Sequence, residues 1–264
     1  MSQEADEPLK AEIKLLLEQF GFTVTAIVPP PLGSSPDFVA EKNGEQFIFE
    51  LKERMDDPAV LAEEKVRLEA GELVSFTESI GSNERVSGRA REGVKQLRAH
   101  NLTGTGFRLL WLHAGGRDPE VQFEQFRATL YGMTQIVAPE LSHTTTCYYF
   151  GHSEFFRSRE ILAGAIISKP KQFQLCINTL FFDVCAFQKS ALVKIFSNGL
   201  LDPDLLASQG DAFVADCSID RNDEAGVLQY LQSKYGYARL MNMNLSRASA
   251  RKLMLPEGSK SLIK

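Results

Sequence analysis

Residues 36–52 read PDFVAEKNGEQFIFELK, and this stretch decides the fold of the N-terminal half. Asn43-Gly44 lies between two apolar runs, which is the strongest short-range signal for a β-hairpin with a two-residue turn. Counting outward from that turn along the two strands brings Asp37 opposite Glu50. Directly opposed side chains share one face of a sheet, with Cβ atoms about 4.5–5.5 Å apart. The hairpin therefore predicts two carboxylates side by side at its open end.

A lysine joins the two carboxylates on the same face of the predicted hairpin. Lys52 lies two residues beyond Glu50, and side chains two apart on a strand point the same way. Phe47, Phe49 and Leu51 alternate with these polar positions, so the opposite face is expected to enter a hydrophobic core.

This grouping of charges points to a bound metal ion. Like charges that oppose each other directly destabilise a pair of strands, so Asp37 and Glu50 need a cation between or beside them. Mg²⁺ takes hard oxygen ligands and keeps water molecules that a phosphate substrate can replace. Lys52 offsets part of the repulsion, and its ammonium can hold an attacking water or stabilise developing phosphoryl charge.

The remaining elements follow from apolar periodicity and from turn residues. Residues 8–20 carry apolar side chains at helical spacing and stop at Gly21, which predicts an amphipathic helix. The other expected elements before residue 140 are a strand over 22–28, a charged helix followed by a long loop over 53–88, a basic helix over 89–100, a strand over 107–112 and a helix over 123–131. The expected elements after residue 140 are strands over 147–150, 173–177, 212–216 and 237–241 and a helix over 223–234.

The motif and the order of elements resemble one known superfamily. Pro36-Asp37 followed by Glu50-Leu51-Lys52, in the order helix, strand, hairpin, helix, strand, is similar to the PD-(D/E)XK phosphodiesterases over residues 8–112 or up to 135. The resemblance implies an α/β protein: a restriction-endonuclease-like mixed sheet core flanked by helices, with an additional α+β C-terminal region. We expect a nuclease-like domain over 1–140 and an α+β region over 141–264, which either completes the same domain or stands alone.

The resemblance also implies roles for individual residues. Asp37 and Glu50 would bind Mg²⁺ or Mn²⁺, Leu51 would lend its main-chain carbonyl to the metal, and Lys52 would orient the attacking water. Many members place a metal-reaching glutamate on the first helix, where Glu12 is the candidate, and an ordinary surface glutamate is the alternative. Some members carry a glutamine on the helix after the triplet, where Gln96 is the candidate and a surface glutamine the alternative.

A cluster of basic residues follows the motif. Together its members could neutralise several phosphates of a nucleic acid, or they could form an ordinary solvated helix face. The cluster consists of Arg85, Arg89, Arg91, Lys95 and Arg98.

Composition indicates which partners and which cellular compartment to expect for the protein. The formal net charge of -5 is not that of a basic nucleic-acid binder, so contact with nucleic acid has to come from a local basic patch. The chain has no apolar run of ~18 residues, and its acidic start lacks an apolar signal core, so we expect no membrane contact. Its four cysteines show no C-x-x-C spacing and are expected to be buried reduced thiols, which fits a cytoplasmic protein.

Three functions compete at this point. The first is a Mg²⁺-dependent endonuclease, a hydrolase that cuts phosphodiester bonds. The resemblance to the superfamily implies DNA rather than RNA as its substrate. The second is a catalytically silent nucleic-acid-binding or assembly module with the same fold. The third is an unrelated α/β protein in which the motif is coincidental. Members of the superfamily often act as dimers, so a homodimer is an open expectation.

Overall fold

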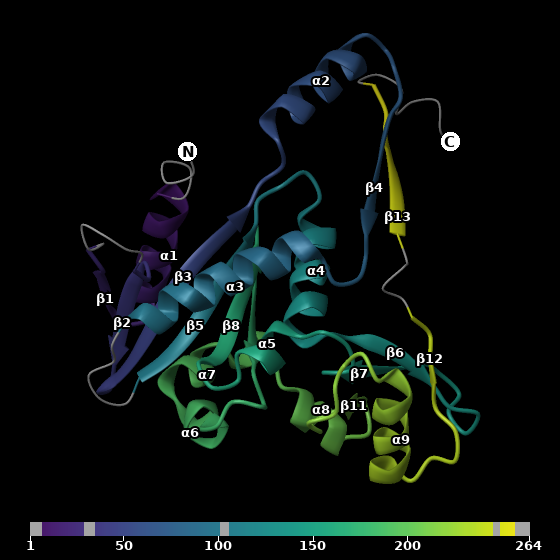
Figure 1. Cartoon of the computed structure of the whole chain (residues 1–264). Coiled ribbons are helices and arrows are strands. Elements are labelled where there is room, and N and C mark those ends of the chain that lie inside the picture. Colours follow the sequence, from purple (N-terminus) through teal and green to yellow (C-terminus); the bar gives the residue numbers. More distant parts are fainter. Residues whose placement is uncertain (1–6, 29–34, 101–105, 245–248, 257–264) are drawn as a thin grey trace.

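The computed structural model describes residues 7–28, 35–100, 106–244 and 249–256 (Figure 1). Its centre is a seven-stranded sheet. In spatial order the strands are β1 (Thr23–Ala26), β2 (Phe38–Lys42), β3 (Glu45–Arg54), β5 (Gly106–Ala114), β8 (Leu162–Lys169), β9 (Gln172–Ile177) and β10 (Leu200–Leu201).

The directions of these strands make the sheet mixed. β1, β2 and β3 run antiparallel, β5 and β8 continue from β3 in parallel, β9 returns antiparallel and β10 runs parallel to β9. Parallel pairs need crossover connections, and α3 (Glu84–Ala99) and α4 (Pro119–Tyr131) supply them between β3, β5 and β8. The predicted mixed sheet flanked by helices is therefore confirmed.

Helices cover both faces of the sheet and create two separate cores. Phe47, Phe49 and Leu51 face one core, whereas Ile48 faces the other, as the alternation in the hairpin predicted. The helices of the first layer are α1 (Glu7–Gln19), α6 (Val184–Lys189) and α7 (Ala191–Ile195). The helices of the second layer are α3 (Glu84–Ala99), α4 (Pro119–Tyr131) and the short α5 (Glu154–Arg157).

Two smaller units accompany the main sheet. The first is a four-stranded sheet with its own core, made of β11 (Ala212–Val214), β7 (Thr145–Tyr148), β6 (Thr134–Val137) and β12 (Met241–Asn242), near α8 (Pro203–Ser208) and α9 (Glu224–Tyr235). The second is an arm that rises from the body in Figure 1, made of α2 (Pro58–Glu69), β4 (Val74–Ser79) and β13 (Ser249–Met254).

Three expectations about individual elements are corrected. The long loop within 53–88 contains β4 and the first turn of α3, because β4 pairs with β13 from the far end of the chain. The strand over 237–241 does not form, and only Met241–Asn242 pairs, as β12. The sequence analysis also missed β8, whose residues are buried on both faces and so lack the alternation that marks a half-exposed strand.

Residues after 140 contribute to more than one unit. β8, β9 and β10 extend the sheet that begins in the N-terminal half, while β7 and β11 belong to the smaller sheet. The proposed boundary at residue 140 stays a prediction, since shared strands and a separate small sheet are both present.

The expectations about membrane contact and about the cysteines can be compared with the structure. Within the described ranges, no helix is both long and apolar enough to cross a bilayer. The four cysteines are free, and Cys147 and Cys176 are buried as expected. Cys185 is exposed and Cys217 partly exposed, so burial of all four is corrected.

Candidate active site

The hairpin that carries the motif forms with the predicted register. Asn43 and Gly44 both have positive φ angles, 55° and 79°, as a two-residue hairpin turn requires. The strand pairs run from Lys42 opposite Glu45 to Phe38 opposite Phe49. Asp37 precedes the first of these strands, and its backbone N–H donates to the Phe49 carbonyl at 3.0 Å. The local turn chemistry thus brings Asp37 next to Glu50 at the open end of the hairpin.

Both oxygens of the Asp37 carboxylate have partners. Oδ2 accepts a hydrogen bond from the backbone N–H of Leu51 at 2.7 Å, which ties the aspartate to the neighbouring strand. Oδ1 lies 2.9 Å from the ammonium Nζ of Lys10, on the first turns of α1. Burial disfavours the charged ammonium, but the contacts with Asp37 and Glu7 outweigh it and raise the pKa of Lys10.

Glu50 is a buried carboxylate with one open oxygen. Its side chain is 2% exposed, and Oε1 lies 2.9 Å from Lys52 Nζ. No donor among the described residues reaches Oε2, and its neighbour Asp37 is itself a carboxylate. Burial raises the pKa of Glu50 to about 8, Asp37 adds to this rise, and Lys52 offsets part of it. Unless a cation is bound beside it, this carboxylate therefore favours its protonated form.

Lys52 is held by three side chains from two elements. Besides Glu50, its Nζ donates to Gln96 Oε1 at 2.8 Å and lies 3.6 Å from Glu92 on the same helix. Gln96 in turn donates weakly to the Ser35 carbonyl at 3.4 Å. The structure thus brings Gln96, predicted from the resemblance alone, into direct contact with Lys52.

A glycine allows α3 to lie close to these residues. A Cβ on Gly93 would lie 2.6 Å from a side-chain carbon of Leu110 and 3.2 Å from Cγ of Glu50. Both distances are shorter than an ordinary van der Waals contact, so a side chain here would push the helix away from the sheet. Gly93 therefore fixes the short approach that lets Gln96 and Glu92 reach Lys52.

The donor set fits a divalent cation of the magnesium kind. Residues 7–28, 35–100, 106–244 and 249–256 hold no cluster of three or more His, Cys, Asp or Glu side chains suited to a metal. Mg²⁺ does not require one, since it is usually bound through one or two carboxylates and keeps several waters. Asp37 and Glu50 supply that pair of carboxylates. Glu50 Oε2 is buried and accepts no hydrogen bond from the described residues, so a cation would satisfy it.

The basic residues of α3 form two stripes. Arg85 and Arg89 are four residues apart and lie on the helix face that continues toward Lys52, where they line a cavity of about 450 Å³. The Arg89 guanidinium donates to the carbonyl of Glu53, next to Lys52 in β3. The second stripe consists of Arg91, Lys95 and Arg98, which are exposed.

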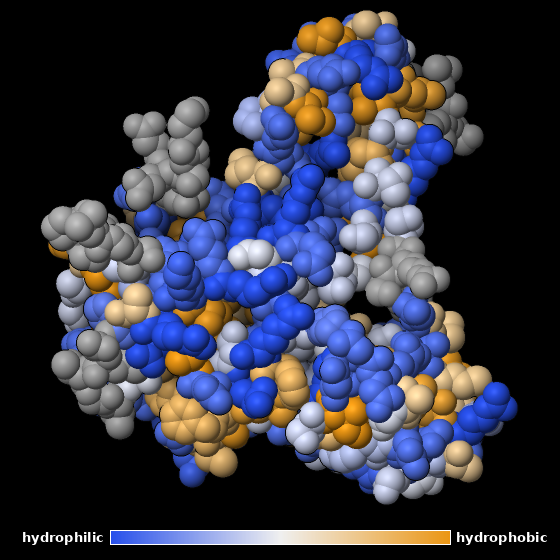
Figure 2. Space-filling view, viewed as in Figure 1, coloured by the Kyte–Doolittle hydropathy of each residue, from blue (hydrophilic) through white to orange (hydrophobic). Residues whose placement is uncertain are grey.

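Arg91 is partly engaged within the protein. It lies 3.2 Å from Glu84 and 3.5 Å from the buried Glu154 of α5. The surface over α3 is largely hydrophilic in Figure 2, which shows this helix on the near side of the molecule. The basic face therefore lies beside the candidate site, with Arg91 the member most occupied by intramolecular contacts.

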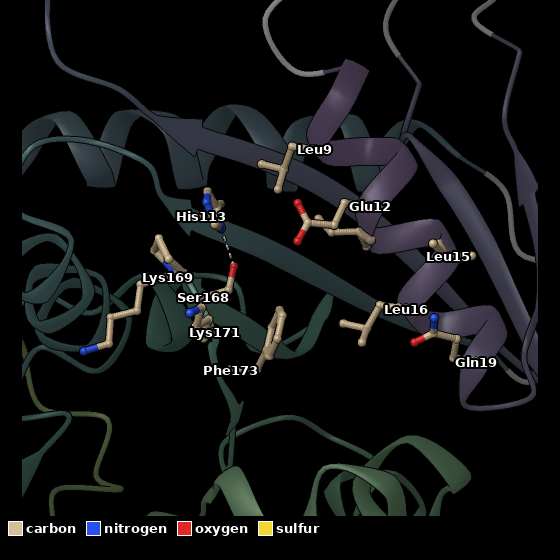
Figure 3. Close-up of a pocket in the computed structure, with 12 residues that line it drawn as sticks. Leu9, Glu12, Leu15, Leu16, Gln19, His113, Ser168, Lys169, Lys171 and Phe173 are labelled. Carbon is tan, nitrogen blue, oxygen red and sulfur yellow. Dashed lines mark hydrogen bonds between the residues drawn. The ribbon is translucent and has the colours of Figure 1, made fainter.

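Glu12 lies away from the two carboxylates. It lines a pocket with His113, Ser168 and Phe173 on the α1 side of the sheet, and its carboxylate points into that pocket in Figure 3. Successive helical residues are rotated by about 100°, so Glu12 and Lys10 point to nearly opposite sides of α1. The structure thus places Lys10, not Glu12, at Asp37, and it brings the other predicted catalytic residues together.

The sequence reasoning missed three residues of this site. Lys10 and Glu92 gave no signal beyond ordinary helix charges, because only the docking of α1 and α3 shows what they touch. Gly93 could have been found, since an isolated glycine inside a helical pattern often marks close packing.

Comparison with known proteins supports the same superfamily. Residues 8–107 match the family model of the archaeal Holliday junction resolvase, Hjc. A search of curated proteins found no match for the chain. Hjc belongs to the PD-(D/E)XK restriction-endonuclease-like superfamily, so residues 8–107 are similar to a family of that superfamily, and the coarse activity that the match indicates is that of a nuclease.

Proposed function

We propose that this protein is a divalent-metal-dependent nuclease that hydrolyses phosphodiester bonds in DNA. One observation carries the proposal: Asp37 and Glu50 converge with Lys52, and the buried Glu50 carboxylate keeps an oxygen that no donor among the described residues reaches. Burying such a pair is unfavourable unless a cation offsets its charge, so the two carboxylates fit a site that holds a metal ion.

In this proposal each residue at the site has a distinct role. Asp37, Glu50 and the main-chain carbonyl of Leu51 hold Mg²⁺ or Mn²⁺. The bound ion would polarise a phosphoryl oxygen and lower the pKa of a bound water. Lys52 directs its ammonium at the attacking water or at the developing phosphoryl charge, and Gln96 and Glu92 keep that ammonium in place.

The substrate would lie along α3. Arg85 and Arg89 neutralise phosphates next to the site, and Arg91, Lys95 and Arg98 extend the contact along the helix. The matched family is named for action on Holliday junctions, so we infer branched DNA as the substrate class. We also propose DNA rather than RNA, and a homodimer as the working unit, from the resemblance of the motif to the PD-(D/E)XK superfamily.

The silent binding module is the less favoured alternative. A module that only binds nucleic acid has no need to keep Glu50 buried beside Asp37, where its charge is costly. It also has no need for three side chains that position Lys52. The complete set of contacts therefore favours catalysis.

The proposal is tested by cleavage of a labelled substrate panel. The natural protein is incubated with Mg²⁺ or Mn²⁺ and a four-way DNA junction, duplex DNA, single-stranded DNA or RNA. We expect cleavage of the junction, and a loss of roughly 100-fold or more in rate for Asp37→Asn and Lys52→Met. Lys14→Met, whose side chain pairs with Glu18 elsewhere on α1, is the matched control and should cleave normally.

Two results would contradict the proposal. The first is an absence of cleavage of every substrate with either metal, which would favour the binding module. The second is equal cleavage by folded Asp37→Asn protein, which would place the reaction at another site.

A further inference from the structure

Lys10 is a second ammonium at the candidate site that the family motif does not include. Its Nζ lies 2.9 Å from Asp37 Oδ1, and the two side chains are only 26% and 14% exposed. Such shielding strengthens the interaction of a charge pair relative to a pair in open solvent. Each of the two carboxylates therefore has its own lysine: Lys10 for Asp37 and Lys52 for Glu50.

The four carboxylate oxygens of Asp37 and Glu50 differ in the partners that they already have, and so in how readily they could bind a metal ion. Asp37 Oδ2 is held by the backbone N–H of Leu51, and Glu50 Oε1 is held by Lys52. This leaves Asp37 Oδ1 and Glu50 Oε2 as the oxygens for a shared cation. Glu50 Oε2 is reached by no donor of the described residues, whereas Asp37 Oδ1 is covered by Lys10. A metal that took Asp37 Oδ1 together with Glu50 Oε2 would place its positive charge beside the Lys10 ammonium, and repulsion between the two cations favours displacement of that ammonium.

Glu7 offers Lys10 a partner after such a displacement. Glu7 Oε1 lies 3.2 Å from Lys10 Nζ, one helical turn away on α1. The ammonium already lies between Glu7 and Asp37, so it can leave Asp37 without losing every carboxylate contact. Rotation of the Lys10 side chain toward Glu7 would open the position at Asp37 Oδ1.

We propose that Lys10 is a built-in counter-ion that a divalent cation must displace from Asp37, and that Glu7 receives it. Lys10 thereby sets the metal concentration at which the site fills. The inference rests on the proposed function, because it takes Asp37 and Glu50 as the metal ligands. Lys10 acts through Asp37 and is a positioning residue rather than a catalytic one.

Binding of the metal alone tests this directly. Mg²⁺ and Mn²⁺ are titrated calorimetrically into the full chain without nucleic acid. Lys10→Met keeps an unbranched side chain that is one atom shorter and removes the charge, and should bind metal about tenfold more tightly. Lys10→Arg keeps the charge and should retain the natural affinity within about twofold. Lys14→Met, one turn farther along α1 and paired with Glu18 instead of Asp37, should bind as the natural protein does.

A double-mutant comparison isolates the part played by Glu7. Glu7→Gln removes the second partner of Lys10, so it should weaken metal binding by roughly two- to threefold in the natural background. In the Lys10→Met background the same change should have no effect, since the residue through which Glu7 acts is absent. An equal effect of Glu7→Gln in both backgrounds would show a direct electrostatic contribution and would contradict the role of Glu7 as receiver.

The outcomes separate this inference from the proposed function. If Asp37→Asn abolishes metal binding while folded Lys10→Met binds with unchanged or lower affinity, the metal site stands and the Lys10 proposal is overturned. If Asp37→Asn binds metal as tightly as the natural protein, the metal site itself is wrong, and the proposed function fails with it.

Discussion

The buried carboxylate of Glu50 predicts an unusual gain in stability from losing a charge. In the absence of divalent metal, Glu50→Gln should make the protein more stable at alkaline pH, although it removes a residue proposed as essential for catalysis. Glutamine keeps the shape of the side chain and cannot ionise. The natural glutamate has to ionise while 2% exposed and next to Asp37.

The size of the effect follows from the pKa of Glu50. Burial first and Asp37 second raise this pKa from 4.5 to about 8. Glu50 holds its proton more tightly in the folded state than in the unfolded state. Its contribution to the free energy of unfolding is therefore complete below pH 4.5 and is lost as the pH rises through 8. At 1.36 kcal/mol for each pKa unit, the loss reaches at most about 5 kcal/mol. Glu50→Gln should therefore match the natural protein near pH 4.5 and exceed it by a few kcal/mol at pH 9.

Urea unfolding at several pH values, with a chelator present, measures this difference. Glu92→Gln is the control, because Glu92 also contacts Lys52 but is 66% exposed. An exposed ion pair contributes roughly 0–1 kcal/mol, so this control should differ little from the natural protein. Added Mg²⁺ should stabilise the natural protein and not Glu50→Gln. A Glu50→Gln protein that is less stable at pH 9, or that differs equally at every pH, would show that ionisation of the buried Glu50 does not destabilise the fold.

Three further predictions concern the metal, the basic helix and its packing. Apparent Mg²⁺ affinity should rise about tenfold per pH unit between pH 6 and 7, because binding has to release the proton of Glu50. Calorimetry at constant ionic strength measures this rise, and an affinity that does not change with pH would contradict it. Arg85→Ala with Arg89→Ala should weaken DNA binding and reduce the slope of log affinity against log salt by about 2, and an unchanged slope would remove both residues from the phosphate contact. Gly93→Ala should cost about 1–3 kcal/mol and lower activity, since its Cβ would lie 2.6 Å from a side-chain carbon of β5. Gly88→Ala on the same helix meets no atom within 4 Å and should be neutral or stabilising, so equal unfolding midpoints for the two variants would contradict the packing argument.

The parts of the site that the sequence could predict are local ones. Asn43-Gly44 determines its turn through backbone geometry alone, and the register of the hairpin then places Asp37 beside Glu50 by counting. The alternation of Phe47 and Phe49 with polar residues assigns the faces for the same reason.

The parts that could not be predicted depend on contacts between distant segments. Whether Lys10 or Glu12 reaches Asp37 is decided by how α1 rotates and docks on the sheet, and both residues look like ordinary helix charges in the sequence. Strand β8 is buried on both faces and so lacks the alternation by which strands are found, and β4 pairs with a strand from the far end of the chain.

Whether Asp37 and Glu50 share a divalent cation can be seen in a crystal structure with bound Mn²⁺, because anomalous scattering locates the ion. We expect one strong peak within about 2–2.3 Å of Asp37 Oδ1 and Glu50 Oε2, with the Lys10 ammonium turned to Glu7. A peak elsewhere, or none at a saturating concentration of Mn²⁺, would contradict it.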